Sequence, residues 1–463
     1  MPGHWLARER LATAGRAIGW RGLGVAALGV TDALLLLWGS EASTARQLIA
    51  VAAASLVGCA ALVWIALDLR FEELPVGWVL GLALALRLIA VQATPLLEDD
   101  HYRYLWDGFR TATSLDPYRL PPSAFFGASD LPQTQRDILG GINNPDLPTV
   151  YGPLLQWLFA LAHVIEPGKV GALQGLLLGV DMAMIGLLAS LRVGPRWLLA
   201  YAVHPAVLKE VMASAHPDGL VALLLLLALV AWQRRHSVCT GALLGAACAT
   251  KVAVLVAVPL FLLPPWRSLG LRAPDGHPRR WSLCVAAGFA ISVCAIYLPF
   301  VAVGGSDEAT LRVFGTQWRF NPLLFRVVEA GLAPGLARLV AAFLIVVGVV
   351  LLAWVWRRKG AASAPTLPPV DEALLLLLLL SPVVNPWYWL WALGPSMLLR
   401  RHVVAAAAGI GALSYANSTV LRESGWLVDS ASTPAFVVGW PLAVVQILVL
   451  GIVWRRDRVN SNR

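Results

Sequence analysis

The chain has 463 residues, of which 58% are hydrophobic and only 14% are charged. Soluble domains carry roughly 25% charged residues, so the composition excludes a water-soluble globular protein. Lys and Arg number 36 against 27 Asp and Glu. Because these positive charges cluster between apolar segments, they indicate membrane topology rather than nucleic-acid binding. We therefore expect an all-α polytopic membrane protein that contacts membrane lipids and no nucleic acid.

The amino-terminal part predicts how the chain enters the membrane. Residues 1–21 contain four arginines, and no signal-peptide cleavage site follows the first apolar segment. We therefore expect a cytoplasmic amino terminus. Residues 22–97 then predict three crossings of about 20 residues each. The expected crossings are Gly22 to Trp38, Ala45 to Leu67 and Val76 to Leu97. They place residues 98–153, the longest polar interruption of the chain, on the external side.

Residues 154–356 predict a membrane bundle in which several helices are short or broken. The apolar segment from Gly152 to Ile165 is short for a full crossing, so we interpret it as interfacial. The segment from Gly241 to Leu263 carries Lys251 near its middle and predicts a hairpin of two short helices with Lys251 at the tip. Residues 304–334 are expected to form a second external segment.

The carboxyl-terminal part continues the alternation of basic loops and apolar segments. Residues 357–370 are basic, then rich in Ala and Pro, and predict a cytoplasmic linker. Residues 371–454 predict further membrane helices, interrupted by two prolines within 381–388. Residues 455–463 predict a cytoplasmic tail. This topology puts every strongly basic cluster on one side and gives about 11–14 crossings, several of them short.

Three adjacent acids, Glu98, Asp99 and Asp100, open the first external segment. Carboxylates at a membrane surface are costly to place, and a pair of them is a common way to build a general base. We therefore predict Asp99 or Asp100 as a catalytic base, with solvated loop acids as the alternative. Arg103 follows at helical spacing, so it is suited to pair with either aspartate or to face a phosphate.

Further polar groups lie at or near the external ends of apolar segments. Lys251 is the strongest, because an unpaired cation within the membrane costs at least about 2.5–3.5 kcal/mol. It requires an anion, either a protein carboxylate or a ligand phosphate. His216 and Asp218 flank a proline before an apolar segment, where Asp218 is also suited to cap a helix. Arg319 is suited to join the same anion or to anchor the chain at the interface.

The sequence provides little indication of a metal site. No histidine pair has the HExxH spacing, and no cysteine pair has the CxxC spacing of a thiolate site. The five cysteines are Cys59, Cys239, Cys248, Cys284 and Cys294, all in or beside apolar segments. We assign no metal ligand and no cofactor, and a divalent cation held by the aspartates stays open.

Residues 98–118 resemble the first extracytoplasmic loop of bacterial polyprenol-phosphate-mannose-dependent mannosyltransferases, which belong to the GT-C glycosyltransferases. The matching stretch reads EDDHYRYLWDGFR, followed by LDPY. Shorter pieces agree in order, namely NPDLPTVYGPL at 144–154, HPAVLKE at 204–210, HPD at 216–218, ATK at 249–251 and SPVVNPWY at 381–388. The chain departs from the family at residues 151–153, where similar enzymes often have Tyr-Pro-Pro and this chain has Tyr-Gly-Pro.

The resemblance implies a GT-C-like bundle with a large first extracytoplasmic loop, and a role in cell-envelope glycan biosynthesis. It implies inverting transfer of a hexose, mannose in this family, from a polyprenyl phosphate to a lipid or glycan hydroxyl outside the bacterial inner membrane. Asp99 or Asp100 would take the acceptor proton, and cations would stabilise the leaving phosphate. Phosphate-binding roles are expected for Arg103, Lys251, His216 and Arg319. Substrate-binding roles are expected for Tyr102, Trp106, Tyr151, Asp218, Asn385, Trp387 and Tyr388.

Two other classes of protein stay open. A transporter or lipid flippase would place ionisable groups within spans and show repeat symmetry. Arg87 and Asp181 favour that class, but no clear repeat is present and the acids lie in a loop. A non-catalytic membrane assembly protein would not need the acid cluster. The sequence does not define the donor sugar, the acceptor, the linkage, the metal dependence or the oligomeric state.

Overall fold

The computed structural model describes most of the chain. The described residues are 3–262, 278–359 and 367–415, together with 444, 448, 451–453 and 455. Part of the expected linker, at 360–366, and most of the final expected crossing and the tail lie outside the described residues. The described part is helical and has no named strand, and one isolated bridge joins Phe320 to Val383. The all-α class is therefore confirmed.

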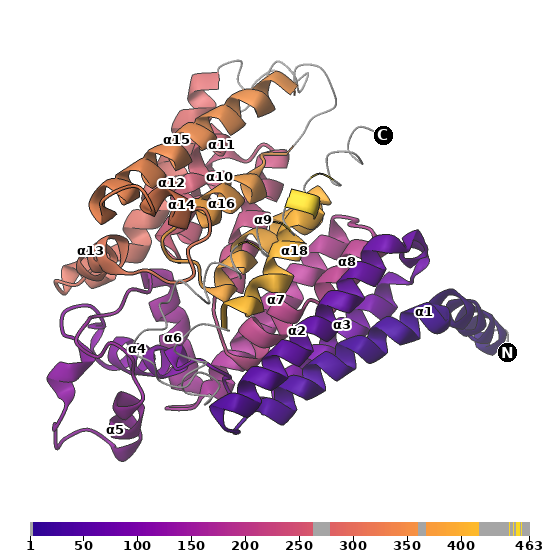
Figure 1. Ribbon diagram of the computed structural model, residues 1–463, viewed down its shortest axis with the longest axis horizontal. Helices are drawn as coiled ribbons and strands as arrows, with labels where there is room; N and C mark the ends of the chain where they lie inside the picture. The colour runs from indigo at the N-terminus through magenta and orange to yellow at the C-terminus, as the bar shows by residue number, and fades with distance from the viewer. Residues whose placement is uncertain are drawn as a thin grey trace. The chain divides into compact units, whose positions relative to one another are not determined.

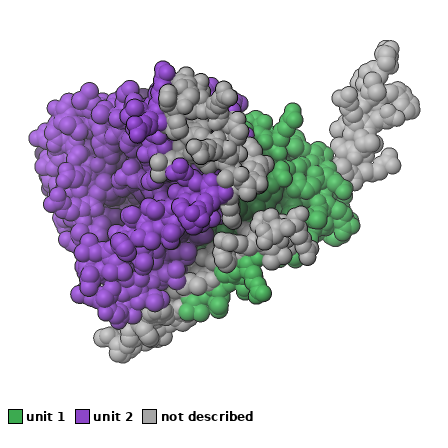
Figure 2. Space-filling view, turned by 90° about the horizontal axis from the view of Figure 1, so that it is seen from above, with its two compact units in different colours: residues 1–97, 178–216, 396–463 green, residues 98–177, 217–395 purple. Residues whose placement is uncertain are grey.

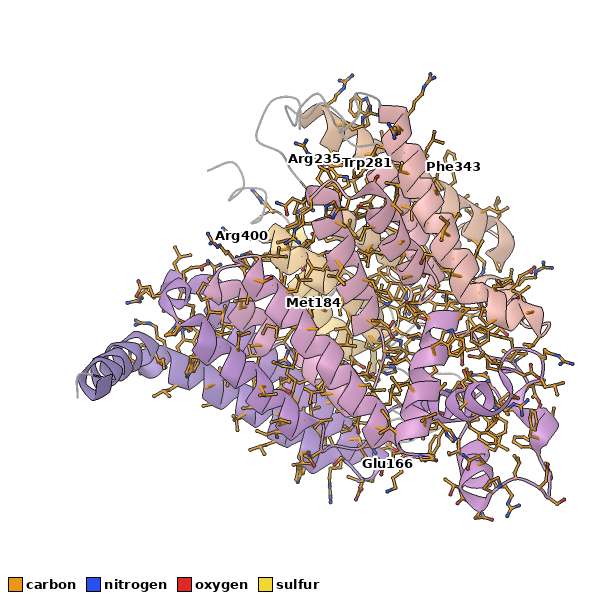
Figure 3. The ribbon with its side chains drawn as sticks, turned by 180° about the vertical axis from the view of Figure 1, so that it is seen from behind. Glu166, Met184, Arg235, Trp281, Phe343 and Arg400 are labelled. Carbon is orange, nitrogen blue, oxygen red and sulfur yellow. The ribbon has the colours of Figure 1, made fainter. Side chains whose placement is uncertain are left out.

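Five of the described helices are long and apolar enough to cross a membrane. They cover Ile18–Gly39, Thr44–Leu67, Val170–Ser190, Arg279–Ala302 and Pro334–Arg358. Shorter apolar helices cover Val76–Ala90, Pro153–Ile165, Gly219–Gln233, Ser237–Cys248 and His402–Tyr415. Large apolar side chains stand outward on the long helices, as Phe343 does with 66% of its surface exposed (Figure 3). The protein is therefore a polytopic membrane protein, while its sidedness and total number of crossings stay predictions.

The chain divides into two compact units, coloured separately in Figure 2. Unit 1 contains residues 1–97, 178–216 and 396–463, and unit 2 contains residues 98–177 and 217–395. Two helices, α7 (Val170–Ser190) and α17 (Leu390–Leu399), contribute residues to both units.

Unit 1 is a helical bundle in which α1 packs against α2 and α3 (Figure 1). Besides its part of α7 and α17, its main elements are α1 (Gly3–Gly39), α2 (Thr44–Leu67), η1 (Leu69–Glu73), α3 (Val76–Ala90), α8 (Pro195–Ala202), the π-helical η3 (Val207–Ala213), α18 (His402–Ile410) and η6 (Gly411–Tyr415). Between helices in lipid, packing and polar contacts replace the hydrophobic effect as the source of stability.

Two expected crossings of unit 1 differ from the sequence prediction. The third helix ends at Ala90 rather than at Leu97, because Pro95 disfavours helical backbone at the preceding residue. The Leu97 amide instead bonds the Gln47 side chain at 2.7 Å. The largely apolar stretch from Trp197 to Met212 predicts a further crossing, but it is broken after α8. Pro205 causes the break because it cannot donate a helical hydrogen bond.

Unit 2 carries both expected external segments on a framework of apolar helices. Its elements, besides its part of α7 and α17, are α4 (Asp100–Ser114), η2 (Pro122–Phe125), α5 (Gln133–Gly140), α6 (Pro153–Ile165), α9 (Gly219–Gln233), α10 (Ser237–Cys248), η4 (Val252–Val256), α11 (Val258–Leu262), α12 (Pro278–Ala302), α13 (Glu308–Gln317), α14 (Phe325–Glu329), α15 (Pro334–Lys359), α16 (Val370–Leu380) and η5 (Pro386–Trp389). Helix α10 packs against α9 and α12, and α15 packs against α16.

Two close approaches within unit 2 determine where its polar residues lie. Helix α4 packs against α6, and a Cβ on Gly108 would lie 2.8 Å from the carbonyl carbon of Phe159. The chain before α6 lies against the end of α10, where the Leu154 amide donates to Ala249 O at 3.1 Å. The helical break predicted at Lys251 is confirmed, since α10 ends at Cys248 and η4 begins at Val252. These contacts hold the chain around Lys251 against the chain that leads into α6.

The segment at 304–334, which is expected to be external, is joined to the proline-broken segment at 381–388 by backbone hydrogen bonds. Phe320 donates to Pro382 O at 3.0 Å and accepts from the Val384 amide at 2.8 Å. Extended backbone pairs in this way because each strand satisfies the other's polar groups. Residues after α13 are therefore fixed beside those that lead into η5.

Candidate active site

One cavity of about 340 Å³ collects polar residues from five parts of unit 2. These parts are the start of α4, the chain before α6, Lys251, α13 with the residues after it, and the chain leading into and through η5. Its charged lining residues are Glu98, Asp100, Arg103, Lys251 and Arg319. Its aromatic lining residues are Tyr151, Phe314, Trp318, Phe320, Trp387 and Tyr388. Ligand sites commonly have volumes of about 300–1,000 Å³, so the cavity has the size of a small-molecule site.

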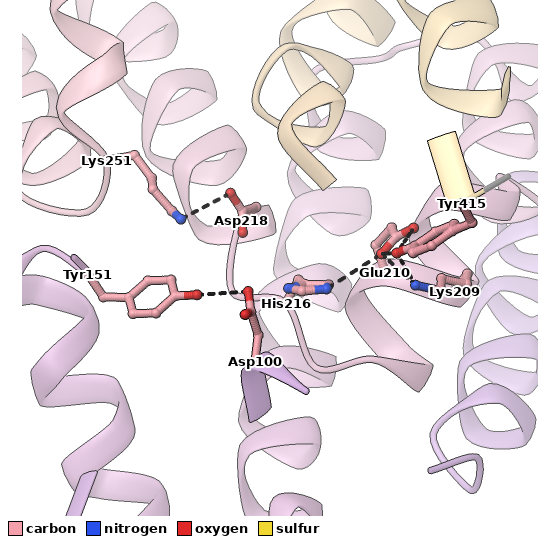
Figure 4. Close-up of polar contacts among 8 residues, drawn as sticks. All are labelled: Asp100, Tyr151, Lys209, Glu210, His216, Asp218, Lys251 and Tyr415. Atoms are coloured by element: carbon pink, nitrogen blue, oxygen red, sulfur yellow. Dashed lines mark hydrogen bonds and ion pairs between the residues drawn. The ribbon is translucent and has the colours of Figure 1, made fainter. Parts of the chain in front are cut away.

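Of the two aspartates predicted as a base, Asp100 is the one that faces the cavity. Its carboxylate accepts a hydrogen bond from the Tyr151 hydroxyl at 2.9 Å (Figure 4). It also accepts one from Asn143 Nδ2 at 3.1 Å. It begins α4, where the helix dipole favours a negative charge. Asp99 accepts from the same Asn143 amide, but it is exposed and is not among the lining residues. The geometry therefore distinguishes two acids that the sequence left equivalent.

Lys251 reaches the same cavity from the break after α10. Its Nζ lies 3.7 Å from Asp218 Oδ1 (Figure 4). It also lies 4.7 Å from the ring centroid of Tyr151 and 5.6 Å from that of Tyr388, distances at which an aromatic face attracts a cation. The anion that Lys251 requires is thus supplied within the protein by Asp218, and 14% of the lysine side chain stays exposed toward the cavity.

The two lining arginines have partners of their own. Arg103, 7% exposed, donates to Leu147 O and Asn144 O at 3.0 Å, and to Asn143 O at 3.4 Å. It therefore shapes the loop before α6 through these three carbonyl groups. Arg319 Nη2 lies 2.7 Å from Glu329 Oε2, while its side chain is 49% exposed.

Besides Asp99, four predicted site residues are not among the described lining residues of the cavity. Tyr102 and Trp106 belong to an apolar cluster formed by α4 and α5. Asp218 is fully buried and accepts from Trp391 Nε1 at 2.5 Å. His216 belongs to unit 1, where its Nε2 lies 3.7 Å from Glu210 Oε2. The other predicted residues of unit 2, apart from Asp99, line the cavity.

Burial sets the protonation of several groups around Asp100. Burial, followed by the nearby Asp100 carboxylate, raises the pKa of Tyr151 well above its ordinary value, so its hydroxyl stays a donor. Burial lowers the pKa of His101 to about 4, although the Asp100 carboxylate opposes this. Burial raises the pKa of Asp107 to about 6, against the opposing effect of the Arg103 charge. Tyr151 and His101 are therefore uncharged at neutral pH, whereas Asp107 is mostly ionised there.

Comparison with known proteins identifies the family of the chain. A family model for the MptA_B family, described as the alpha-(1->6)-mannopyranosyltransferase N-terminal domain, matches residues 12–266. The chain belongs to this family. The match covers Asp100, Tyr151, Asp218 and Lys251, whereas α13 and η5 lie beyond it. The family resemblance of residues 98–118 is confirmed.

A curated relative matches a larger part of the chain. Alpha-(1->6)-mannopyranosyltransferase A of Mycobacterium tuberculosis (strain ATCC 25618 / H37Rv) is 26% identical over 346 residues, which cover 69% of this chain. The matched region spans 65% of that relative, less than two thirds of its length. No solved structure matches the chain.

The sequence did not identify every residue that lines the cavity. Phe314 and Trp318 of the second external segment both line it, with ring centroids 5.3 Å apart. Residues four apart lie on one face of a helix. This spacing in the sequence is the feature that could have predicted that the two rings lie side by side. Asn143, which donates to both adjacent aspartates, also lines the cavity, and the sequence predicts no role for it.

The described partners of the Asp100 carboxylate are hydrogen-bond donors of the protein. The Asp100 carboxylate is engaged by an amide and a phenol. Among the described residues, no group of three or more His, Cys, Asp or Glu side chains is arranged to hold a metal ion. We therefore assign no metal ligand, and the question of a divalent cation stays open.

Proposed function

We propose that the protein is an integral membrane glycosyltransferase of the GT-C type. It transfers a hexose, mannose, from a polyprenyl phosphate donor to a hydroxyl of a lipid or glycan acceptor. One observation carries the proposal: Asp100 and Lys251 line the same cavity, where the Tyr151 hydroxyl donates to Asp100 and the Tyr151 ring faces Lys251. Among the described residues, Asp100 receives hydrogen bonds from neutral groups, and Lys251 supplies a cation to the same cavity. A base and a cation at one cavity match the two charges that such a transfer moves.

The acceptor hydroxyl is activated by Asp100. The carboxylate accepts the hydroxyl proton while the acceptor oxygen attacks the anomeric carbon of the donor from the face opposite the phosphate. The bond from the anomeric carbon to the phosphate oxygen breaks, and the sugar is transferred with inversion. General base catalysis of this kind contributes about 10²–10⁴-fold to a rate. Two neutral donors, Tyr151 and Asn143, orient the carboxylate without removing its charge.

The leaving polyprenyl phosphate is stabilised by Lys251. Negative charge develops on the phosphate as the bond breaks, and a fixed cation in a site of low dielectric stabilises it strongly. Arg319 borders the same cavity but is paired with Glu329, so we assign it a secondary role. The aromatic residues at the cavity, including Trp387 and Tyr388, supply flat apolar surfaces for a sugar ring.

The membrane supplies the donor. An isoprenoid chain dissolves in the bilayer, so its phosphate meets the protein at the membrane surface. Short and broken helices in membrane proteins occur where the backbone lines a cavity, and the break at Lys251 has this character. We place the cavity on the external face of the bacterial inner membrane and both termini in the cytoplasm.

A transporter is the second candidate, and its main support was the pair Arg87 and Asp181. In unit 1 these side chains are almost fully buried and form an ion pair of 2.7 Å. The Tyr201 hydroxyl donates to the same carboxylate at 2.6 Å. The charges of Arg87 and Asp181 are balanced within this cluster, so a substrate ion is not required to balance them. Glycosyl transfer is therefore the better supported function.

The test is transfer of radiolabel from polyprenyl-phosphate-mannose to a crude membrane glycolipid extract, using purified protein in nanodiscs. Wild type should transfer label, Asp100→Asn should lose about 10²–10⁴-fold in rate, and Asp99→Asn, the matched control, should stay near wild type. Absence of transfer from mannose, glucose and arabinose donors, or an unimpaired Asp100→Asn protein, would remove the proposal and favour transport.

A further inference from the structure

Asp218 is a buried acid that the proposed mechanism does not use. None of its side chain is exposed, and a buried carboxylate is costly unless it has partners. It precedes α9, yet its side chain makes no capping hydrogen bond to that helix. Helix capping, the ordinary reason for an aspartate at this position, therefore does not account for it.

The contacts of Asp218 are directed to one side chain of the cavity. Oδ1 accepts from Trp391 Nε1 at 2.5 Å, which orients the carboxylate. The same oxygen lies 3.7 Å from Lys251 Nζ. Charge-assisted hydrogen bonds are usually about 2.7–2.9 Å long. At the longer distance Asp218 attracts the ammonium group, and the lysine retains N–H donors for a ligand, since an ammonium group has three.

Lys251 needs such an anchor because the cavity also holds acids. Its flexible side chain has four carbons, and the cavity is lined by Glu98 and Asp100 as well. Asp100 is within contact of Tyr151, the residue whose ring faces the ammonium group. A lysine released from its anchor would close onto this carboxylate, because opposite charges attract strongly in a site of low dielectric. The base and the cation would then neutralise each other.

We propose that Asp218 is a positioning residue that holds Lys251 away from Asp100, so that the cavity keeps a free base and a free cation. This inference rests on the proposed function for the identity of the anion, a polyprenyl phosphate. Asp218 itself touches neither substrate. Asp218 attracts the ammonium group of Lys251 from the buried side. The rings of Tyr151 and Tyr388 limit lateral movement of that group.

The test measures binding rather than transfer, so that it does not depend on turnover. Protein in nanodiscs is titrated with polyprenyl monophosphate and, separately, with the uncharged polyprenol of equal length, and binding is followed by tryptophan fluorescence. The ratio of the two affinities is the phosphate preference. Wild type should show a clear preference. Asp218→Asn, which keeps an acceptor for Trp391, should lower it by about tenfold or more, the size of a close charge-pair coupling.

Asp218→Asn is then combined with a second substitution, to identify why the phosphate preference is lost. If Lys251 is captured by Asp100, then adding Asp100→Asn to Asp218→Asn should restore the phosphate preference. In a Lys251→Met background, Asp218→Asn should change nothing, because its effect passes through the lysine. The conservative variant Asp218→Glu keeps the charge and should retain most of the preference. A merely structural role for Asp218 would not produce this pattern of rescue.

The outcomes separate this inference from the proposed function. Equal binding of both lipids by wild type would remove the anion site and with it both proposals. A clear wild-type preference that Asp218→Asn leaves intact would overturn only the positioning role. If the Asp218→Asn single variant does not fold, the test is the comparison of Lys251→Met with the Lys251→Met, Asp218→Asn double variant. A further loss on adding Asp218→Asn to Lys251→Met would show that Asp218 acts independently and would contradict the proposal.

Discussion

The buried charges of unit 1 and the cavity charges of unit 2 are arranged in opposite ways. In unit 1, Arg87 pairs with Asp181 and also donates to the carbonyl oxygens of Tyr201 and Ala202. Lys209 and Glu210 form a second buried pair, in which Tyr415 contacts both members. Each of these clusters contains both signs of charge and its own hydrogen-bond donors, so each is closed.

The cavity of unit 2 is open by comparison. In the part of the chain that the structure describes, Asp100 receives hydrogen bonds from the neutral groups of Asn143 and Tyr151. The Asp218 carboxylate lies 3.7 Å from Lys251 Nζ on the buried side. Both charges border empty space of ligand size. The comparison teaches that ionisable residues in a membrane protein are not equally informative about function. A closed cluster stabilises the fold, while a cluster with charge left toward a cavity is able to bind and react.

Breaking a closed cluster should have the largest effect on stability. Arg87→Met leaves the buried Asp181 without its cation, and removal of one partner of a buried ion pair costs about 3–5 kcal/mol. We expect little monodisperse protein by fluorescence-detected size exclusion. The double variant Arg87→Met with Asp181→Leu should recover both yield and glycosyl transfer. A double variant that folds well but has lost activity would show that the pair takes part in function after all.

Asp107 should give a pH-dependent effect on stability of up to about 3 kcal/mol, since one pKa unit corresponds to about 1.36 kcal/mol. Burial raises its pKa from 3.8 to about 6 in the folded protein. Between these values the folded state binds a proton that the unfolded state does not, so stability falls as pH rises through this window. Above about pH 6, this contribution of Asp107 to the free energy of unfolding is fully lost.

Asp107→Asn should remove this pH dependence. The amide oxygen can still accept from Gln156 Nε2, which lies 3.2 Å from the wild-type carboxylate. Thermal midpoints in detergent at about pH 4 and about pH 7 should therefore differ less in the variant than in wild type. Asp130→Asn, which changes an exposed loop acid, is the control and should leave the wild-type difference unchanged. A variant with undiminished pH dependence would assign that dependence to another group.

The sequence predicted the helical class, the polar loop, the break at Lys251 and the family. These depend on local patterns, namely long apolar segments, adjacent acids and a cation within an apolar stretch. The early end of the third helix was not anticipated, because a single Pro95 outweighs the apolar character of the residues around it. Local signals therefore identified which residues were unusual for a membrane segment, and they located the segments that carry them.

The contacts between those residues could not be predicted in the same way. Arg103 has the helical spacing to pair with an acid, yet it bonds the carbonyl groups of the loop before α6. Lys251 required an anion, and only the tertiary structure shows that this is Asp218. Likewise, Asp99 and Asp100 differ because α4 begins at the second of them. Such choices depend on long-range packing, which spacing along the chain does not encode.

Gly152 tests how closely the chain must approach Lys251. A Cβ at this position would lie 2.9 Å from the carbonyl carbon of Ala249 and 3.0 Å from Thr250 O. These are backbone atoms and cannot turn aside, so Gly152→Ala should cost about 1–3 kcal/mol, as overpacking does. It should also impair transfer, because the adjacent Tyr151 contacts both Asp100 and Lys251.

The control for this substitution is Gly140→Ala, where an added Cβ has no neighbour within 4 Å among the described residues. That variant should match wild type in thermal midpoint and in transfer rate. If Gly152→Ala behaved like the control, the close approach would be dispensable and the loop before α6 would be free to shift without harm.

Two tyrosines give the sharpest version of the comparison, although the expected effects are the smallest. Tyr415 donates to Glu210 Oε2 at 3.0 Å in the closed cluster of unit 1, and Tyr151 donates to Asp100 Oδ2 at 2.9 Å at the cavity. Both are buried and both bond a carboxylate, so Tyr→Phe removes the same group from each. A hydrogen bond to a charged group is worth about 1.5–3 kcal/mol.

Tyr415→Phe should lower the free energy of unfolding by about 1.5 kcal/mol, the lower end of that range. This loss should appear as a lower thermal midpoint, with the transfer rate unchanged. Tyr151→Phe should lower the transfer rate about tenfold, the effect of about 1.4 kcal/mol on a barrier, with little change in the midpoint. The reason is that Asp100 borders the cavity, where water can replace the lost donor in the resting protein but does not reproduce its orientation during proton transfer. If both variants lost stability equally and kept their activity, the distinction between a closed and an open cluster would have no functional meaning.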